Sequence, residues 1–299
     1  MTLRHVFSFK DLGAAAVWLL VQQARGIPDA RAHSTFLEDK TAVLLFAQES
    51  FPERLCITAA IRQMSGHVVY LGSGSWRDEV HSYPTQMSQL VSYYVDCAFV
   101  FGLPLAPLRA SRELAQIPVI NAGSPDGMPL NVLADLACMY KHTDDFSAIR
   151  VAWLGCANGT LNSLIEATEY FPFELRIAVP HGSGPDEHVL AEARSAGRRV
   201  SVVESREEAV RDAHYLYAGC SGGTDDESAE CRMLGNDLMR LAAPNARILL
   251  STAPSCSTPV ENGLLQSKAS LLPRQAENRL RIHKRLLHWI FDNDQCMAR

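Results

Sequence analysis

The sequence predicts an α/β protein built from two doubly wound parallel-sheet domains. Two observations lead to this fold class. The chain has 299 residues, of which 47% are hydrophobic, and a domain usually holds about 100–200 residues. Short β-rich runs also alternate with helical segments along its whole length, which is typical of doubly wound sheets.

Each expected strand is a continuous run rich in Val, Ile and Leu rather than an alternating one. Such runs are typical of strands that are buried on both faces of a parallel sheet. The expected strands are Ala42–Phe46, His67–Leu71, Ala98–Phe101, Pro118–Ile120, Arg150–Leu154, Glu174–Val179, Arg199–Val203, His214–Tyr217 and Arg247–Leu250.

The segments between these strands have helical spacing. The expected helices are Glu53–Met64, Met87–Val95, Asn131–Tyr140, Asn162–Thr168 and Asp186–Ala196. The apolar run Leu12–Val21 is too short for a membrane span and predicts a buried helix.

The end of the chain predicts one long helix, Ala276–Asp292, which can cross back onto the first domain. Its basic residues between Arg279 and Arg285 predict a solvated face that complements the helix dipole. The polar segment Lys141–Asp145 separates two groups of strands. We therefore expect one domain of residues 1–141 with 276–299 and a second of residues 142–275.

Composition and charge narrow the function. A net charge of -5 argues against a nucleic-acid partner, and no apolar run is long enough to predict a membrane partner. The eight cysteines form no CxxC pairs, which favours reduced thiols in a cytoplasmic protein and predicts no metal site. No dinucleotide-binding glycine fingerprint is present, so we expect no cofactor.

Five segments carry a resemblance to a known family. They are Phe7–Leu12, Leu45–Arg54, Met128–Asp135, Trp153–Ser163 and Gln275–Arg279. In order and spacing they resemble the aspartate/ornithine carbamoyltransferases: the helix entry, the Ser-Thr-Arg-Thr-Arg loop, the His-Pro-x-Gln-x-Leu-Ala-Asp segment, the second-domain turn and the Gln-Ala-Glu-Asn-Arg signature.

The resemblance implies a transcarbamoylase-like fold with a small-molecule substrate in a cleft between two domains. It also implies a homotrimer, whose sites are completed by a loop from the neighbouring subunit. By position that loop is Gly72–Ser82, with Trp76 and Arg77 at its tip.

On the carbamoyl-phosphate side, the resemblance carries over only a few of the anion-binding residues. Ser50, the second loop arginine Arg54, and Arg279 match the family. Pro52 and Phe101 replace arginines, Phe51 and Glu53 replace threonines, Met128 replaces a histidine and Asn131 a glutamine. Each lost charge-assisted contact is worth about 1.5–3 kcal/mol. We therefore expect ordinary carbamoyl-phosphate affinity to be lost, and Glu53 to repel a phosphate.

The amino-acid side departs from the family as well. Gly159 stands for the substrate-facing asparagine, with Asn158 beside it, and Gly219 stands where the ornithine enzymes place an aspartate. Thr224 and Asp225 lie in the loop that replaces Ser-Met-Gly. Together with Asn131, these residues predict a non-standard substrate site rather than one for ornithine.

Three functions remain open from the sequence. The first is a divergent transcarbamoylase-like transferase for a small amino acid or amine, with a non-standard donor site. The second is a non-catalytic homologue that binds a small ligand or partner. The third is a serine hydrolase using Ser221 in Gly219–Gly223, with Asp225 or Asp226 and with His283 or His288.

Overall fold

The structure, a computed structural model, describes residues 3–26, 29–73, 76, 84–141, 145–219, 234–252 and 260–292. The chain forms two compact units: unit 1 holds residues 1–137 and 277–299, and unit 2 holds residues 138–276. The chain passes from one unit to the other inside two helices, α6 (Pro129–Tyr140) and α12 (Leu272–Phe291).

Unit 1 contains a four-stranded parallel sheet in the order β2-β1-β3-β4. Its strands are β1 (Thr41–Phe46), β2 (His67–Leu71), β3 (Cys97–Phe101) and β4 (Val119–Gly123). Its helices are α1 (Phe9–Gly26), α2 (Phe51–Gln63), α4 (Pro84–Tyr94), α5 (Leu105–Ala110), a 3-10 turn at Ser111–Glu113, most of α6, and α12 from residue 277 onward.

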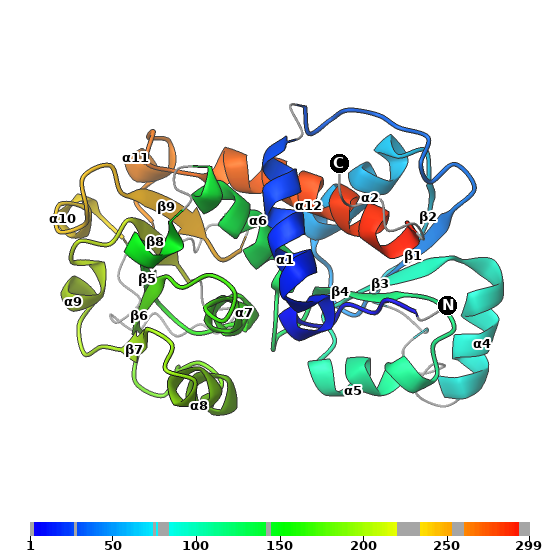
Figure 1. The fold of residues 1–299 in the computed structure, drawn as a ribbon, viewed down its shortest axis with the longest axis horizontal. Helices are drawn as coiled ribbons and strands as arrows, with labels where there is room; N and C mark the ends of the chain where they lie inside the picture. Colours follow the sequence, from blue (N-terminus) through cyan, green and yellow to red (C-terminus); the bar gives the residue numbers. More distant parts are fainter. Residues whose placement is uncertain are drawn as a thin grey trace. The chain divides into compact units, whose positions relative to one another are not determined.

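Helices cover both faces of this sheet. Successive side chains of a strand point to opposite faces, so neighbouring residues of one strand contact different helices. In β3, the Phe99 ring packs against His283 of α12 with ring centroids 6.1 Å apart. The next residue, Val100, packs in a cluster with Leu108 of α5. Figure 1 shows α12 and α5 on opposite sides of the strands in this unit.

Unit 2 contains a five-stranded parallel sheet in the order β7-β6-β5-β8-β9. Its strands are β5 (Arg150–Leu154), β6 (Glu174–Ala178), β7 (Val200–Val202), β8 (Tyr215–Ala218) and β9 (Arg247–Leu250). Its helices are a 3-10 turn at Phe146–Ala148, α7 (Gly159–Ala167), α8 (Glu187–Ser195), α9 (Arg206–Val210), α10 (Asn236–Met239) and α11 (Asn262–Leu265).

The central strands of unit 2 are buried on both faces. Leu154, Leu216 and Ile248 belong to a cluster that also holds residues of α9, α10 and α11. On the neighbouring strands β5 and β8, the fully buried rings of Trp153 and Tyr217 stack with centroids 5.6 Å apart.

The predicted fold class is confirmed, and each of the nine expected strands lies in one of the two parallel sheets. The largest difference among the strands is β4, which extends three residues beyond the expected end to Gly123. Among the described residues, no helix is both apolar and long enough for a membrane crossing.

The prediction of a solvated basic face on the last helix is wrong. Arg281 and Lys284 are only 9% and 6% exposed. Lys284 Nζ donates to the carbonyl oxygens of Ala30 and Ala32 at 2.8 and 2.7 Å. Neutral carbonyl groups of the backbone satisfy this ammonium group. Every residue has such a carbonyl group, so the sequence does not show which ones will be the partners.

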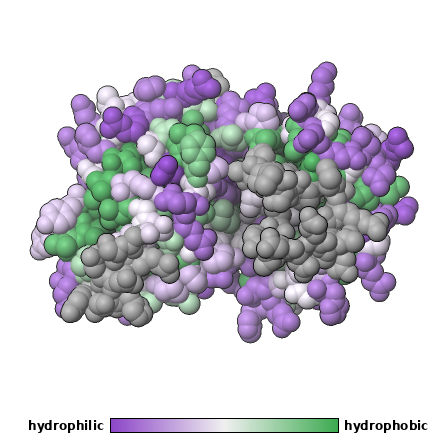
Figure 2. All heavy atoms as spheres, turned by 180° about the vertical axis from the view of Figure 1, so that it is seen from behind, coloured by the Kyte–Doolittle hydropathy of each residue, from purple (hydrophilic) through white to green (hydrophobic). Residues whose placement is uncertain are grey.

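Most of the described large hydrophobic side chains that are exposed belong to unit 1. They are Phe36, Phe51, Leu55, Val69, Leu71, Leu90, Tyr93 and Tyr94 in unit 1, and Val202 and Leu241 in unit 2. Figure 2 shows hydrophobic patches between hydrophilic ones on the face turned away from the viewer in Figure 1.

Candidate functional site

Each sheet has one point where the chain order reverses direction, between β1 and β3 in unit 1 and between β5 and β8 in unit 2. In open parallel sheets, ligands bind beyond the carboxyl ends of the strands at these points. Helix α2 follows β1 and helix α7 follows β5. The N-termini of α2 and α7 therefore mark the candidate site residues in each unit.

Helix α2 begins with an unusual arrangement of Ser50 and Glu53. Ser50 occupies the N-cap position, but its side chain caps no backbone N–H group. Its hydroxyl instead donates to Glu53 Oε2 at 2.8 Å. Pro52, which has no N–H to leave unpaired, lies in the first turn between them.

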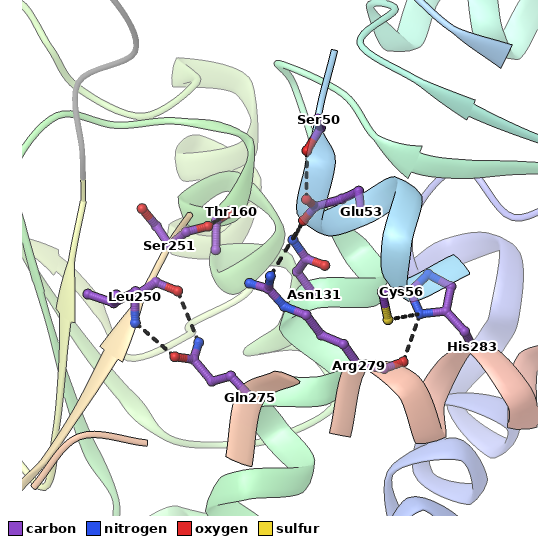
Figure 3. Close-up of polar contacts among 10 residues, drawn as sticks. All are labelled: Ser50, Glu53, Cys56, Asn131, Thr160, Leu250, Ser251, Gln275, Arg279 and His283. Carbon is purple, nitrogen blue, oxygen red and sulfur yellow. Dashed lines mark hydrogen bonds and ion pairs between the residues drawn. The ribbon is translucent and has the colours of Figure 1, made fainter. Parts of the chain in front are cut away.

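Three side chains converge on the Glu53 carboxylate (Figure 3). Besides Ser50, Asn131 Nδ2 donates to Glu53 Oε1 at 3.2 Å, and Arg279 Nη1 lies 3.5 Å from the same oxygen. Asn131 comes from the first turn of α6 and Arg279 from α12. Only 11% of the Glu53 side chain and 12% of the Arg279 side chain are exposed. The structure thus brings together three of the predicted site residues, around a carboxylate that we expected only to repel a phosphate.

Arg54, the third of the predicted anion-binding residues with Ser50 and Arg279, makes different contacts. Its Nη1 lies 3.6 Å from Glu49 Oε2, and its guanidinium lies over the Tyr70 ring at 4.7 Å from the centroid. The Tyr70 hydroxyl in turn donates to Glu49 Oε1 at 2.7 Å. The Arg54 side chain is 41% exposed, so water screens this ion pair more than that of Arg279.

Apolar side chains lie at the carboxyl ends of the central strands of unit 1. The rings of Phe46 and Phe101 stack with centroids 5.0 Å apart. Phe101 and Met128 both lie against Gly123, where a Cβ atom would be 2.5 Å from Phe101 Cε2 and 2.7 Å from Met128 Sδ. Phe101 and Met128, which we expected to replace an arginine and a histidine of the family, therefore lie against one backbone position, and neither carries a charge.

A thiol and an imidazole lie beside the Glu53 cluster (Figure 3). Cys56 Sγ is 3.8 Å from His283 Nδ1, and this nitrogen is 2.7 Å from the carbonyl oxygen of Arg279. Since a carbonyl only accepts, Nδ1 carries the proton and cannot receive one from the thiol. Burial raises the pKa of Cys56 to about 12 and lowers the pKa of His283. The pair is a neutral packing contact rather than a thiolate nucleophile with its base.

In unit 2, the polar residues near the N-terminus of α7 bond mainly to the backbone. Asn158 is the N-cap of α7, and its Oδ1 accepts from the N–H groups of Thr160 and Leu161. Its Nδ2 donates to Ser251 Oγ at 3.2 Å, and Thr160 Oγ1 donates to the Ser251 carbonyl at 3.1 Å. The predicted substrate residue Asn158 thus already satisfies a helix terminus.

The turns after β5 and β8 approach each other through two glycines. Gly155 has φ +104°, and a Cβ atom there would lie 2.4 Å from Gly219 O. A Cβ atom on Gly219 would lie 2.8 Å from Trp153 Cζ2 and 2.9 Å from Cys156 O. The indole of Trp153 therefore leaves no room for a side chain at Gly219.

The signature Gln275–Arg279 mainly ties α12 to its surroundings. In unit 2, Gln275 pairs with both the N–H and the carbonyl group of Leu250, at 3.1 and 3.0 Å (Figure 3). In unit 1, Glu277 pairs with Arg281 at 2.7 Å, and Asn278 accepts from Arg281 at 2.8 Å. Arg279 is the residue of this segment that reaches the Glu53 cluster.

Several predicted residues lie elsewhere or outside the described residues. Trp76 is 8% exposed, and its indole donates to the Gly72 carbonyl at 2.7 Å within the same chain. Arg77, Thr224 and Asp225 lie outside the described residues, and so do the hydrolase candidates Ser221 and Asp226. Of the two histidines considered for a hydrolase, His283 bonds to Arg279 and His288 lies against the Phe36 ring.

No group of three or more His, Cys, Asp or Glu side chains within the described ranges is arranged to hold a metal ion. The described cysteines Cys56, Cys97, Cys138 and Cys156 form no disulfide.

Sequence reasoning missed that Glu53 gathers Ser50, Asn131 and Arg279. A local signal for part of this cluster exists, because Ser50 and Glu53 are three residues apart and such spacing at a helix start places the two side chains together. The partnership with Arg279 has no such signal, since the two residues are 226 positions apart.

Two protein-family models match the chain. The model described as "Aspartate/ornithine carbamoyltransferase, carbamoyl-P binding domain" matches residues 4–141. The model described as "Aspartate/ornithine carbamoyltransferase, Asp/Orn binding domain" matches residues 147–290.

Individual relatives agree with this assignment. The ornithine carbamoyltransferase of Nitratidesulfovibrio vulgaris is 30% identical over 296 residues, which cover 96% of this chain and 99% of the relative. That of Oleidesulfovibrio alaskensis is 31% identical, with 97% and 99% covered. The crystal structure of ornithine carbamoyltransferase from Thermus thermophilus shares the fold, with a TM-score of 0.85 at 24% identity, covering 96% of this chain and 98% of that one. The chain belongs to the aspartate/ornithine carbamoyltransferase family.

Proposed function

We propose that this chain is a transferase of the carbamoyltransferase type that acts on a small amino acid or amine other than ornithine. Its donor site differs from the standard carbamoyl-phosphate site. The observation that carries the proposal is the convergence of Ser50, Asn131 and Arg279 on the Glu53 carboxylate. Unit 1 keeps a set of anion-recognising donors but directs them to one of its own side chains.

In this proposal, unit 1 recognises the donor. The cluster of Ser50, Asn131 and Arg279 around the Glu53 carboxylate lines the proposed donor site, and Arg54 supplies a second, more exposed guanidinium. The amine nitrogen attacks the carbonyl carbon of the carbamoyl donor, a C–N bond forms, the bond from that carbon to the donor's leaving group breaks, and the leaving group departs with the bonding electrons while the nitrogen gives up a proton. This step relies chiefly on orientation and on stabilisation of the developing negative charge. Such chemistry needs aligned donors and does not require a nucleophilic side chain.

Unit 2 recognises the acceptor, with Asn158, Thr224 and Asp225 as the proposed contacts. Ornithine is disfavoured because position 219, where we expect the ornithine enzymes to place an aspartate, is a glycine here. Trp153 and Cys156 leave no room for an aspartate side chain at this position. The relatives at about 30% identity are named ornithine carbamoyltransferases. We do not extend their substrate, ornithine, to this chain.

The proposal includes a cytoplasmic homotrimer in which Trp76 and Arg77 serve the site of a neighbouring subunit. The exposed hydrophobic residues Phe51, Leu55, Val69 and Leu71 support a subunit interface on unit 1, because α2 and the edge strand β2 carry them together. Sedimentation at micromolar concentration should give about three times the monomer mass of 32.9 kDa.

A non-catalytic homologue that binds a small ligand or partner is the second candidate. The same occupied cluster favours it, because a site that satisfies its own donors needs no substrate to do so. The packing of Trp153 against Gly219 favours it as well.

Calorimetric titration of the purified protein with carbamoyl phosphate, and then with a panel of amino acids and amines, separates these functions. We expect weak or no binding of carbamoyl phosphate and saturable binding of an amino acid or amine. Mass spectrometry of reaction mixtures with the bound compound and a series of carbamoyl donors should then show a carbamoylated product.

Binding without any product would favour the non-catalytic homologue. Tight carbamoyl-phosphate binding followed by conversion of ornithine to its carbamoylated product would overturn the proposal.

A further inference from the structure

The Glu53 carboxylate has the surroundings of a bound anion. Its two oxygens receive a hydroxyl, an amide and a guanidinium from α2, α6 and α12. Glu53 also lies in the first turn of α2, and Asn131 in the first turn of α6. A helix N-terminus favours negative charge, and charge-assisted donors strengthen that preference.

The N-cap residue shows that these donors are oriented toward the carboxylate. An N-cap serine normally accepts a hydrogen bond from a backbone N–H of the first turn. Ser50 makes no such bond and donates its proton to Glu53 Oε2 instead. Its hydroxyl therefore donates a hydrogen bond to an anionic group rather than capping the helix.

The charges within this cluster balance. Arg279 supplies one positive charge and Glu53 one negative charge, and both side chains are almost completely buried. Phe101 and Met128 at the neighbouring strand and helix ends add no charge. A dianion that entered beside Glu53 would meet a guanidinium that is already paired with a carboxylate, in a place where burial removes most of the solvation of a charge.

We propose that Glu53 is an internal occupant of the anion site and is the residue that excludes a dianionic, phosphate-bearing donor. This inference rests on the proposed function, because it specifies the donor that the site rejects. The donor that the chain accepts is then a neutral or singly charged compound. Removing the Glu53 carboxylate should leave Ser50, Asn131 and Arg279 free to bind a tetrahedral oxyanion.

The test is a calorimetric titration of the full chain with inorganic phosphate at fixed ionic strength. We compare the wild type with Glu53→Thr, which removes the carboxylate and keeps a hydroxyl. Glu38→Thr is the matched control, because it removes the same charge at an exposed position. We expect Glu53→Thr to bind phosphate about tenfold to a hundredfold more tightly than the wild type and the control, the gain of one charge-assisted contact.

Two further variants make the result decisive. Glu53→Gln removes the charge at constant volume, and it carries the test if circular dichroism shows that the threonine variant does not fold. Combining Glu53→Thr with Arg279→Met should abolish the gain, because the anion would then lack its guanidinium.

Equal phosphate affinity in the wild type and in the folded Glu53 variants would overturn the inference. A gain that persists without Arg279, or one that Glu38→Thr also shows, would overturn it too. The titration requires no turnover. The transferase activity can therefore fail while the Glu53 result stands, and the Glu53 result can fail while a carbamoylated product is found.

Discussion

The two units use polar side chains at their switch points in opposite ways. In unit 1, Ser50, Asn131 and Arg279 bond to another side chain, Glu53. In unit 2, Asn158 and Thr160 bond mainly to backbone groups. Contacts between side chains can be exchanged for contacts with a ligand, whereas contacts with the backbone hold turns and helix ends in place. We therefore expect the side-chain contacts of unit 1 to change more readily than the backbone contacts of unit 2.

The largest effect should come from breaking the framework of unit 2 at Gly155. Gly155→Ala places a Cβ atom 2.4 Å from Gly219 O on a residue with φ +104°. We expect a loss of about 3 kcal/mol or more in the free energy of unfolding, from backbone strain and overpacking together. Urea unfolding followed by circular dichroism measures this loss.

Gly184→Ala is the control for this substitution, because a Cβ atom at Gly184 would meet nothing within 4 Å. Its effect should stay within about 0.5 kcal/mol. Equal stability of the two variants would contradict the close approach of the two turns.

A smaller effect should come from breaking the Glu53 cluster of unit 1. Arg279→Met leaves a buried carboxylate without its cation and should cost about 2–3 kcal/mol of unfolding free energy, since removing one partner of a buried pair is strongly destabilising. Arg54→Met should cost less than about 1 kcal/mol, because the Arg54–Glu49 pair is exposed.

A double-mutant cycle of Arg279→Met with Glu53→Gln sharpens this result. The double variant should recover at least about 1 kcal/mol of the loss if the two side chains interact directly. Additive losses would show that Arg279 acts through other contacts.

The sequence predicts the strands of both units better than it predicts the contacts of the site residues. Continuous hydrophobic runs identify the nine strands of the described residues, because burial on both faces of a parallel sheet leaves a local pattern. Ser50, Asn131 and Arg279 can be selected as site residues from the family resemblance. That they bond to Glu53 cannot be predicted, since it depends on the packing of helices far apart in the sequence.

Two other features, the burial of Lys284 and the lack of room for a side chain at Gly219, cannot be predicted from the sequence either. The carbonyl groups of Ala30 and Ala32 and the indole of Trp153 reach these residues only in the folded chain. A basic residue on a helix and a glycine in a loop are common in any sequence. Their burial and contacts depend on residues that are distant in the sequence.

The smallest predicted effect concerns the pH dependence of unit 1. Burial lowers the pKa of His283, so as the pH falls below about 6.5 the unfolded state binds a proton that the folded state does not. The contribution of His283 to stability is thus fully present above pH 6.5 and is lost as the pH falls toward the folded-state pKa. His283→Asn keeps a donor for the Arg279 carbonyl and does not titrate, so its stability should fall less between pH 7.5 and 5.5.

Thermal unfolding at a series of pH values measures this slope. His181→Asn is the control, because His181 is exposed, and it should show the slope of the wild type. A wild-type slope in His283→Asn as well would mean that this imidazole does not contribute to the acid sensitivity.

The path of α12 has a consequence for the order in which the protein is made. Unit 1 begins at the N-terminus, yet Arg279, His283 and Lys284 reach it only from residues 277–292. Domains generally fold as units while the ribosome synthesises the chain from its N-terminus. Residues 1–137 of unit 1 must therefore wait until residues 277–292 have been made, with the carboxylate of Glu53 lacking its cation, while the described strands of unit 2 have all been made by then.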